Sequence, residues 1–403
     1  MAFAFLVVMM FATLPSPLYG LYRTRDHLSA LTITVVFAIF AGGTITTLLR
    51  ERSIVARFGR RGAMLGGVAT MMVAAVLLAA WKALPGLLIG RLLTGVAIGM
   101  AAGVAIPYLI ELRLRADPKA SPLPARNIGT AVNVGALGIG PLVAGFLAQW
   151  APQPLVLPYI VIVALGAVAL IGLAGAPETG APAPRAAAQG RPPAPAGRAR
   201  LPVPAAAGTI AAFAASGLFA GLSGLILATT LHQTSHALSG ATLFLVFTAG
   251  TAAQLGTNRL PASRVLAFGT ISTIVGLVLL VVAVRLSTPS LALFMIGGAL
   301  IGAGAGAVYK GTTVIVLEAT APENRVAMTS ALVIAVFVGL SVPVIGAGIA
   351  LNAGASTANT VLGFAIVVAL GVSLSGWALL GRRSAGPQRA APPAAPAEKE
   401  LSP

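Results

Sequence analysis

Two basic side chains lie inside long apolar stretches of this sequence. Arg91 interrupts the stretch 86–109, and Lys310, next to Tyr309, interrupts the stretch 290–314. A charge inside a membrane-spanning helix costs at least about 2.5–3.5 kcal/mol on insertion scales, so each is a functional candidate. Either could bind an anionic group in a central cavity, and Lys310 could also release a proton. Alternatively, Arg91 caps backbone carbonyls or reaches the surface, and Lys310 extends to the nearby interface.

Acidic residues are few, and none occupies the centre of an apolar stretch. Asp and Glu number 9 in 403 residues. Proton relays in membranes use embedded titratable groups, so proton coupling has little residue support here. Asp26, Glu111 and Glu318 remain as candidates at the ends of apolar stretches. We expect Glu111 and Glu318 to pair with arginines of neighbouring loops.

Uncharged polar side chains complete the candidate cavity. Thr, Tyr, Asn and Gln within apolar stretches can hydrogen-bond a solute, although a tyrosine near a span end is also typical of the membrane interface. With the two cations, the predicted cavity residues are Arg91, Lys310, Tyr309, Thr13, Tyr19, Asn133 and Gln254.

No residue pattern indicates catalysis or a cofactor. The absence of cysteine excludes disulfides, thiolate metal sites and cysteine nucleophiles. No Gly-rich phosphate loop followed by Lys and Ser or Thr is present, so ATP-driven activity is not indicated. His232 and His236 are four residues apart, which is weak evidence for a metal. We predict a protein that is not an enzyme and holds neither metal nor cofactor.

The composition indicates a membrane protein. Hydrophobic residues make up 57% of the chain and charged residues 9%, against about 25% charged residues in globular domains. The net charge of +17 alone would favour nucleic acid, but the basic residues separate long apolar runs, so we predict no nucleic-acid partner. A spanning helix needs about 17–25 apolar residues. Twelve stretches qualify: 2–19, 29–49, 62–81, 86–109, 128–150, 155–175, 205–230, 240–258, 264–284, 290–314, 326–350 and 358–381.

Basic residues predict how the chain crosses the bilayer. With the N-terminus in the cytoplasm, twenty of the 26 Lys and Arg fall in cytoplasmic segments and four in outer loops. This asymmetry follows the positive-inside rule and places both termini in the cytoplasm. Arginine far outnumbers lysine and alanine is abundant, which indicates a bacterial protein of the inner membrane. The first span begins almost at Met1, so a cleaved signal peptide is an alternative and the natural start is expected slightly upstream.

A Pro/Ala/Arg-rich segment divides the spans six and six. Its composition cannot bury a core and predicts a flexible cytoplasmic linker, and the C-terminal end repeats that composition. The predicted parts are an N-terminal six-helix bundle (1–176), the linker (177–204), a C-terminal six-helix bundle (205–381) and a disordered tail (382–403).

The two halves share a weak internal repeat. A pair of glycines four residues apart precedes a glutamate by twelve residues in each half, and a proline followed by a glycine recurs in the next span. Duplicated halves are common in transporters, with the solute site near the midplane between them. For any single glycine, close helix packing is the simpler explanation. The repeat comprises Gly95, Gly99 and Glu111 against Gly302, Gly306 and Glu318, and Gly140, Pro141 and Gly145 against Pro343 and Gly346.

Four local patterns resemble the major facilitator superfamily, and the segment from Pro15 to Tyr19 resembles its bacterial drug-efflux-like subgroup. The four patterns are the loop from Arg52 to Arg61, the segment from Arg91 to Gly95, the segment from Gly140 to Gly145, and Pro177-Glu178-Thr179. The resemblance covers all twelve spans. It implies an all-α polytopic fold of two pseudo-symmetric six-helix bundles, which transports a solute by alternating access, and an antiporter motif in the fifth span.

The signature loop departs from the family pattern in ways that concern the gate. Family loops open with Gly and carry Asp four residues later, whereas this chain has Arg52 and Ala56, with Glu51 nearby. The resemblance therefore implies a cytoplasmic gate with an altered latch. The expected gate residues are Arg57, Gly59, Arg60, Arg61, Glu111, Glu318 and Arg259, and the expected helix-packing residues are Gly95, Gly99, Gly140, Pro141, Gly145, Gly302 and Gly306.

Three functions fit these patterns. The first is proton-coupled efflux of small organic molecules by a monomer embedded in the lipid bilayer. The second is a facilitator or importer of a small anionic or polar solute, which Arg91 and Lys310 favour. The third is a membrane scaffold or sensor that keeps the fold without transport, which the altered loop and the lack of embedded acids favour.

Overall fold

The computed structural model describes residues 1–179 and 200–384, with side chains up to residue 381. Within those residues it contains twelve helices, or chains of helices, long and apolar enough to cross a membrane, which confirms the predicted all-α polytopic fold class. The flexible linker and the disordered tail were predicted largely for residues 180–199 and 385–403, which lie outside the described residues.

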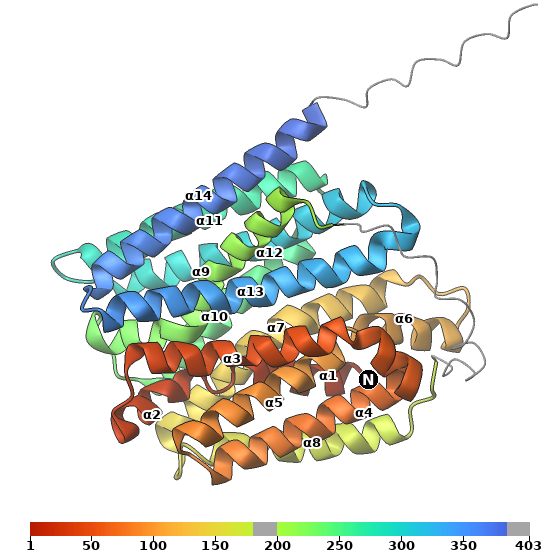
Figure 1. The fold of residues 1–403 in the computed structure, drawn as a ribbon, viewed down its shortest axis with the longest axis horizontal. Helices are drawn as coiled ribbons and strands as arrows, with labels where there is room; N and C mark the ends of the chain where they lie inside the picture. The colour runs from red at the N-terminus through yellow and green to blue at the C-terminus, as the bar shows by residue number, and fades with distance from the viewer. Residues whose placement is uncertain (180–199, 385–403) are drawn as a thin grey trace, which may run out of the picture.

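The first half consists of α1 to α8 (Figure 1). The first span is divided among α1, η1 and α2, because Pro15 and Pro17 interrupt the helical hydrogen bonds, and the fourth span is divided between α5 and α6 after Gly103. The elements are α1 (Ala2–Thr13), η1 (Ser16–Leu18), α2 (Tyr19–Asp26), α3 (Ala30–Leu49), α4 (Glu51–Ala80), α5 (Leu84–Ala102), α6 (Ala105–Ala116), α7 (Leu123–Trp150) and α8 (Leu157–Ala174).

The second half consists of α9 to α14, stacked beside the first in Figure 1. Serine side chains cap the N-termini of two of its helices. Ser235 Oγ accepts a hydrogen bond from Leu238 N (3.2 Å), and Ser290 Oγ accepts one from Leu293 N (3.4 Å). The elements are α9 (Val203–Thr229), α10 (His236–Gly256), α11 (Ala262–Arg285), α12 (Leu291–Glu318), η2 (Pro322–Asn324), α13 (Arg325–Asn352) and α14 (Thr357–Ser384).

Helices continue beyond several of the predicted span edges, and the two extensions that carry the predicted gate are the following. The loop expected before residue 62 is helical from Glu51, with a kink at Gly59, where φ is 71°. The fourth span continues through α6 to Ala116, past the predicted edge at 109. Both extensions are polar, so apolarity alone placed the start of α4 too late and the end of the fourth span too early.

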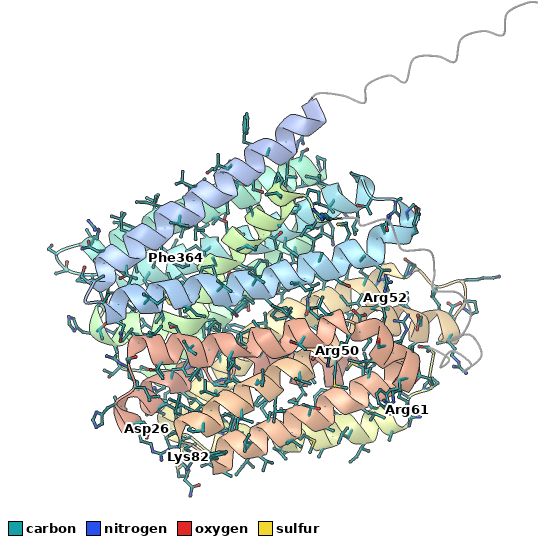
Figure 2. All side chains as sticks on the ribbon, viewed as in Figure 1. Asp26, Arg50, Arg52, Arg61, Lys82 and Phe364 are labelled. Atoms are coloured by element: carbon teal, nitrogen blue, oxygen red, sulfur yellow. The ribbon has the colours of Figure 1, made fainter. Side chains whose placement is uncertain are left out.

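The two ends of the molecule differ in charge. Figure 2 shows Arg52 and Arg61 at one end and Asp26 and Lys82 at the other. We call the first end the basic face; it carries the α3–α4, α6–α7 and α10–α11 connections and the ends of α12 and α14. The other end, with the end of α2 and the start of α10, is the opposite face.

The same backbone contact occurs in both halves. A Cβ added at Gly95 of α5 would lie 1.8 Å from the Phe40 carbonyl oxygen of α3, and one at Gly302 of α12 would lie 1.9 Å from the Val246 carbonyl oxygen of α10. Only glycine permits such an approach. The remaining packing glycines behave alike: Gly99 against Thr44, Gly306 against Gly250, and Gly140 against Met10.

Candidate functional site

A cavity of about 300 Å³ lies between the two halves near the basic face. The first turns of α7 form one wall, and the end of α10 and the second half of α12 form the other. Its lining is mixed, with apolar surface from leucine and valine and several hydrogen-bonding groups. The lining residues are Leu123, Arg126, Asn127, Thr130, Gln254, Leu255, Asn258, Tyr309, Lys310, Thr313 and Val314.

Lys310 reaches from α12 to the end of α10. Its Nζ donates to the Gln254 carbonyl oxygen at 2.5 Å, to Thr257 Oγ1 at 3.2 Å and to Asn258 Oδ1 at 2.7 Å. A cation at a helix C-terminus stabilises the partial negative charge of the terminal carbonyls. All three acceptors are neutral, so the positive charge of Lys310 has no carboxylate among these partners.

Two neighbours of Lys310 shape the same wall. Tyr309 packs edge-on against Phe213, with ring centroids 5.9 Å apart. Gln254 is buried, with 4% of its side chain exposed, and within the described residues its Nε2 has no hydrogen-bond partner. Three of the residues predicted for a solute cavity, Tyr309, Lys310 and Gln254, thus lie together along this one.

Toward the opposite face the two halves pack closely. We call these contacts between the halves, α3 against α13 and α7 against α10, the seam. On one side, Phe40 of α3 meets Phe337 of α13 edge-on, with centroids 6.0 Å apart, and a Cβ at Gly348 would lie 2.1 Å from Thr34 Oγ1. These contacts join the halves on the α3–α13 side, away from the helices that line the cavity.

The other side of the seam joins α7 and α10. A Cβ at Gly145 would lie 2.5 Å from the His236 carbonyl oxygen, and one at Gly240 would lie 2.3 Å from the Pro141 carbonyl oxygen. Gln149 Oε1 accepts hydrogen bonds from His236 N (2.9 Å) and Ser235 Oγ (3.2 Å). Gly145 and Pro141 therefore lie between the halves, unlike the other predicted packing glycines.

Beyond the seam, the interface is hollowed again at the opposite face. Cavities of about 100 Å³ and 260 Å³ lie between η1–α2 on one side and α9–α10 on the other. Tyr19, predicted for the central cavity, lines the smaller one. The interface thus has a packed middle and a recess at each end.

Arg91 lies outside the cavity, inside the first half. Its side chain is fully buried, and its guanidinium donates to the carbonyl oxygens of Ala12 (2.7 Å), Phe37 (3.1 Å) and Val36 (3.4 Å). It also stacks over the Phe40 ring, 4.6 Å from the centroid. Of the alternatives predicted for Arg91, the carbonyl contact is the one present, because the broken first span leaves the end of α1 beside it.

Two further predicted cavity residues lie elsewhere. Thr13 Oγ1 donates to the Leu137 carbonyl oxygen at 2.5 Å and so joins α1 to α7 within the first half. Asn133 is half-buried on α7, one turn beyond the cavity residue Thr130. The periodicity of an apolar stretch could not separate side chains that face a partner helix from those that face a cavity.

The predicted gate residues of the first half form a network on the basic face. Arg60 forms a 2.9 Å ion pair with Glu111, whose other oxygen accepts from Thr179 Oγ1 at 2.6 Å. Glu178 accepts hydrogen bonds from Arg60 N (2.9 Å) and Arg61 N (3.0 Å), the first amides after the kink at Gly59. This carboxylate caps the resumed helix α4, as acids do at helix N-termini.

Sequence reasoning did not assign a role to Glu178. The sequence feature that could have indicated this role is the segment Pro177-Glu178-Thr179, which the network holds in place. Arg115 donates to the Glu178 carbonyl oxygen (2.9 Å), and Tyr108 donates to the Pro177 carbonyl oxygen (2.7 Å). The network joins α4, α6 and the end of α8. These contacts all lie within one half, so none of them bridges the two halves.

The remaining gate candidates are spread over the basic face. Arg57 and Arg259 are exposed, and the Arg57 guanidinium lies 5.3 Å from the Phe58 ring centroid. Glu318 lines a larger cavity of about 500 Å³ together with Arg200. That cavity lies within the second half, so motion between the halves would not open or close it.

The described residues contain no group of three or more His, Cys, Asp or Glu that could hold a metal ion. The family model of the Major Facilitator Superfamily matches residues 1–260. The chain belongs to the Major Facilitator Superfamily. As a transporter of this superfamily, it has the multi-pass membrane architecture described above. The sequence matches no curated protein.

Solved superfamily structures have the same fold. The inward-open xylose transporter XylE from E. coli is 13% identical, with a TM-score of 0.68 over 93% of this chain and 94% of that chain. The nucleoside transporter NupG is also 13% identical, with a TM-score of 0.64 over 94% of this chain and 98% of that chain. At this identity the likeness concerns the fold alone.

Proposed function

We propose that this superfamily member is a secondary transporter that moves small organic molecules across the bacterial cytoplasmic membrane by alternating access. The observation that carries the proposal is the uneven interface between the halves, packed along the seam and hollowed by a cavity toward the basic face. Rocking one half against the other would close this cavity and open the seam. The positive-inside rule supports the basic face as cytoplasmic, with both termini there.

The direction we propose is export coupled to protons. Its support is the antiporter-like segment from Gly140 to Gly145, whose Gly145 and Pro141 backbones touch α10 across the seam. Backbone contacts without interlocked side chains allow helices to slide. Among the residues that line the cavity, Lys310 is the candidate carrier of the coupled proton.

Solute flux in sealed vesicles tests this proposal. Purified monomeric protein is reconstituted into liposomes, and movement of labelled solutes is followed with and without an imposed pH gradient. We expect movement that depends on the gradient and stops when an ionophore collapses it. Flux that continues unchanged without the gradient contradicts the proton clause, and vesicles with no flux for any solute contradict transport altogether.

A facilitator or importer is the second candidate. The observation that favours it is the absence of a carboxylate among the cavity-lining residues, since carboxylates are the usual proton carriers of coupled transporters. Such a protein would exchange labelled for unlabelled solute without any ion gradient. A scaffold or sensor would show neither exchange nor net flux.

A further inference from the structure

We infer that the cavity between α7, α10 and α12 binds a small organic anion through its carboxylate. The inference rests on the proposed function, because it names the class of solute that this cavity holds. Three observations carry it: the charge of the cavity, an unpartnered donor in its wall, and its size.

The cavity carries positive charge with no acid in its lining. Lys310 and Arg126 both line it, and none of the lining residues is Asp or Glu. The partners of Lys310 are a carbonyl oxygen, a hydroxyl and an amide oxygen, all neutral. Lys310 is half-buried, so its attraction to an anion is less screened than that of the exposed Arg126, because Coulomb attraction grows as the local dielectric constant falls.

A buried donor points to the same ligand. Gln254 Nε2 has no hydrogen-bond partner within residues 1–179 and 200–384, although the side chain is 96% buried and lines the cavity beside Lys310. A buried polar group without a partner is costly, so a solute that supplies an acceptor gains affinity. The two oxygens of a carboxylate can accept from Gln254 and from Lys310 together once one of the three neutral acceptors of Lys310 is displaced, because an ammonium group has three donors.

The size and the apolar lining describe the rest of the solute. About 300 Å³ lies at the lower end of the range of about 300–1,000 Å³ typical of small-molecule pockets. Leu123, Leu255, Val314 and the Tyr309 ring supply apolar surface. The solute is therefore compact, with a carboxylate at one end and a short carbon body.

The first half shows that the fold does not require this charge. At the place in α5–α6 that corresponds to Lys310, the first half has Gly103, where an added Cβ would lie 2.4 Å from the Glu51 carboxylate carbon. At the corresponding contact in the second half, the neutral side chain of Asn258 lies opposite Lys310. The repeat therefore does not require a cation at this position, and the charge of Lys310 is specific to the half that lines the cavity with it.

Thermal stabilisation of the full-length protein by matched acids and amides tests the inference. The protein is held in nanodiscs of zwitterionic lipid, and its unfolding is followed with acetate, lactate, succinate, benzoate and salicylate, and with their neutral amides. We expect at least one carboxylate to stabilise the protein and its amide to do so at least about tenfold more weakly, since hydrogen bonds to charged groups are the strong ones.

Three variants locate the effect. Lys310→Met is expected to weaken the stabilising carboxylate at least about tenfold, Lys310→Arg to retain most of its affinity, and Lys119→Gln, which removes an exposed charge from the same face, to change nothing. If every carboxylate acts like its amide, or if Lys310→Met binds it as well as the natural chain does, the inference is wrong. Flux of a neutral solute in the sealed liposomes used to test the proposed function would then leave that function standing.

Discussion

Each half of the molecule has one cation well inside a predicted apolar stretch, Arg91 in the first and Lys310 in the second. Both side chains donate to backbone carbonyl oxygens, but their surroundings differ. Arg91 donates to carbonyl oxygens at the end of α1 and along α3, and Lys310 donates to a carbonyl oxygen at the end of α10. Arg91 is fully buried between aromatic rings, whereas Lys310 lines the cavity between the halves.

A buried charge is therefore not by itself a binding site. Arg91 has no access to a solute in this conformation, so its charge serves the packing of the first half. Its ring partner Phe40 also touches Phe337 across the seam, so that packing supports the contact between the halves. Lys310 combines the same capping role with a place in the cavity lining, and for this reason we propose it, rather than Arg91, as the functional cation.

Removing the buried cation is expected to have the largest effect. Arg91→Met leaves the Ala12 carbonyl and its neighbours without their charged donor, so we expect a loss of at least about 3 kcal/mol in unfolding free energy. Thermal unfolding in detergent measures it, with Arg91→Lys expected between the variant and the natural chain. An unchanged melting temperature for Arg91→Met would contradict the claim that the charge of Arg91 stabilises the first half.

Neutralising the cavity cation in place is expected to affect binding and spare the fold. Asn258→Asp places a carboxylate where an amide oxygen lies 2.7 Å from Lys310 Nζ. The new ion pair competes with a solute anion, so carboxylate affinity falls at least about tenfold while the melting temperature is kept or raised. Equal carboxylate affinity in Asn258→Asp and the natural chain, measured by calorimetry, would contradict a binding role for Lys310.

Alanine substitutions at two glycines that the repeat pairs, Gly145 and Gly346, are expected to change the stability of the protein in opposite directions. Gly145→Ala pushes a Cβ against the His236 carbonyl oxygen across the seam, which costs about 1–3 kcal/mol as overpacking. A Cβ at Gly346 would meet nothing within 4 Å, so Gly346→Ala gains helix propensity of about 1 kcal/mol or less. Melting temperatures that move together would mean that the seam contact is absent.

The smallest effect is expected from the cap at the kink of α4. Glu178→Gln keeps one acceptor for the amides of Arg60 and Arg61 but removes the charge, so we expect about 1 kcal/mol of destabilisation. Carboxylate binding should not change, since the network lies within the first half, away from the cavity. A shift in affinity larger than the shift in stability would connect this network to the solute site.

The fold was predictable from the sequence because membrane spans are long and nearly uniform in composition. Apolar length gave the twelve spans, and breaks such as Pro15 and Gly59 left local signals. The ends of α4 and α6 were missed because polar turns continue those helices beyond the apolar stretch.

The site was only partly predictable, because it depends on which side of each helix faces the other half. Of the residues predicted for the cavity, Tyr309, Lys310 and Gln254 line one cavity, whereas Arg91 and Thr13 contact neighbours in their own half. The repeat paired Gly145 with Gly346, but the seam glycine of α13 is Gly348, two residues later. Such a shift is invisible in spacing alone, because it arises from how α13 is rotated against α3.

A reversible crosslink across the seam tests alternating access most directly. The chain has no cysteine, so Thr34→Cys with Gly348→Cys introduces a unique pair; a Cβ at Gly348 would lie 3.0 Å from Thr34 Cβ, near the roughly 3.5–4.5 Å of disulfides. The measurement is solute flux in vesicles before oxidation, after oxidation and after reduction, with each single variant as control. We expect flux to stop on oxidation and to return on reduction, because the crosslink holds the two halves together at the seam. Undiminished flux through the crosslinked protein would contradict alternating access.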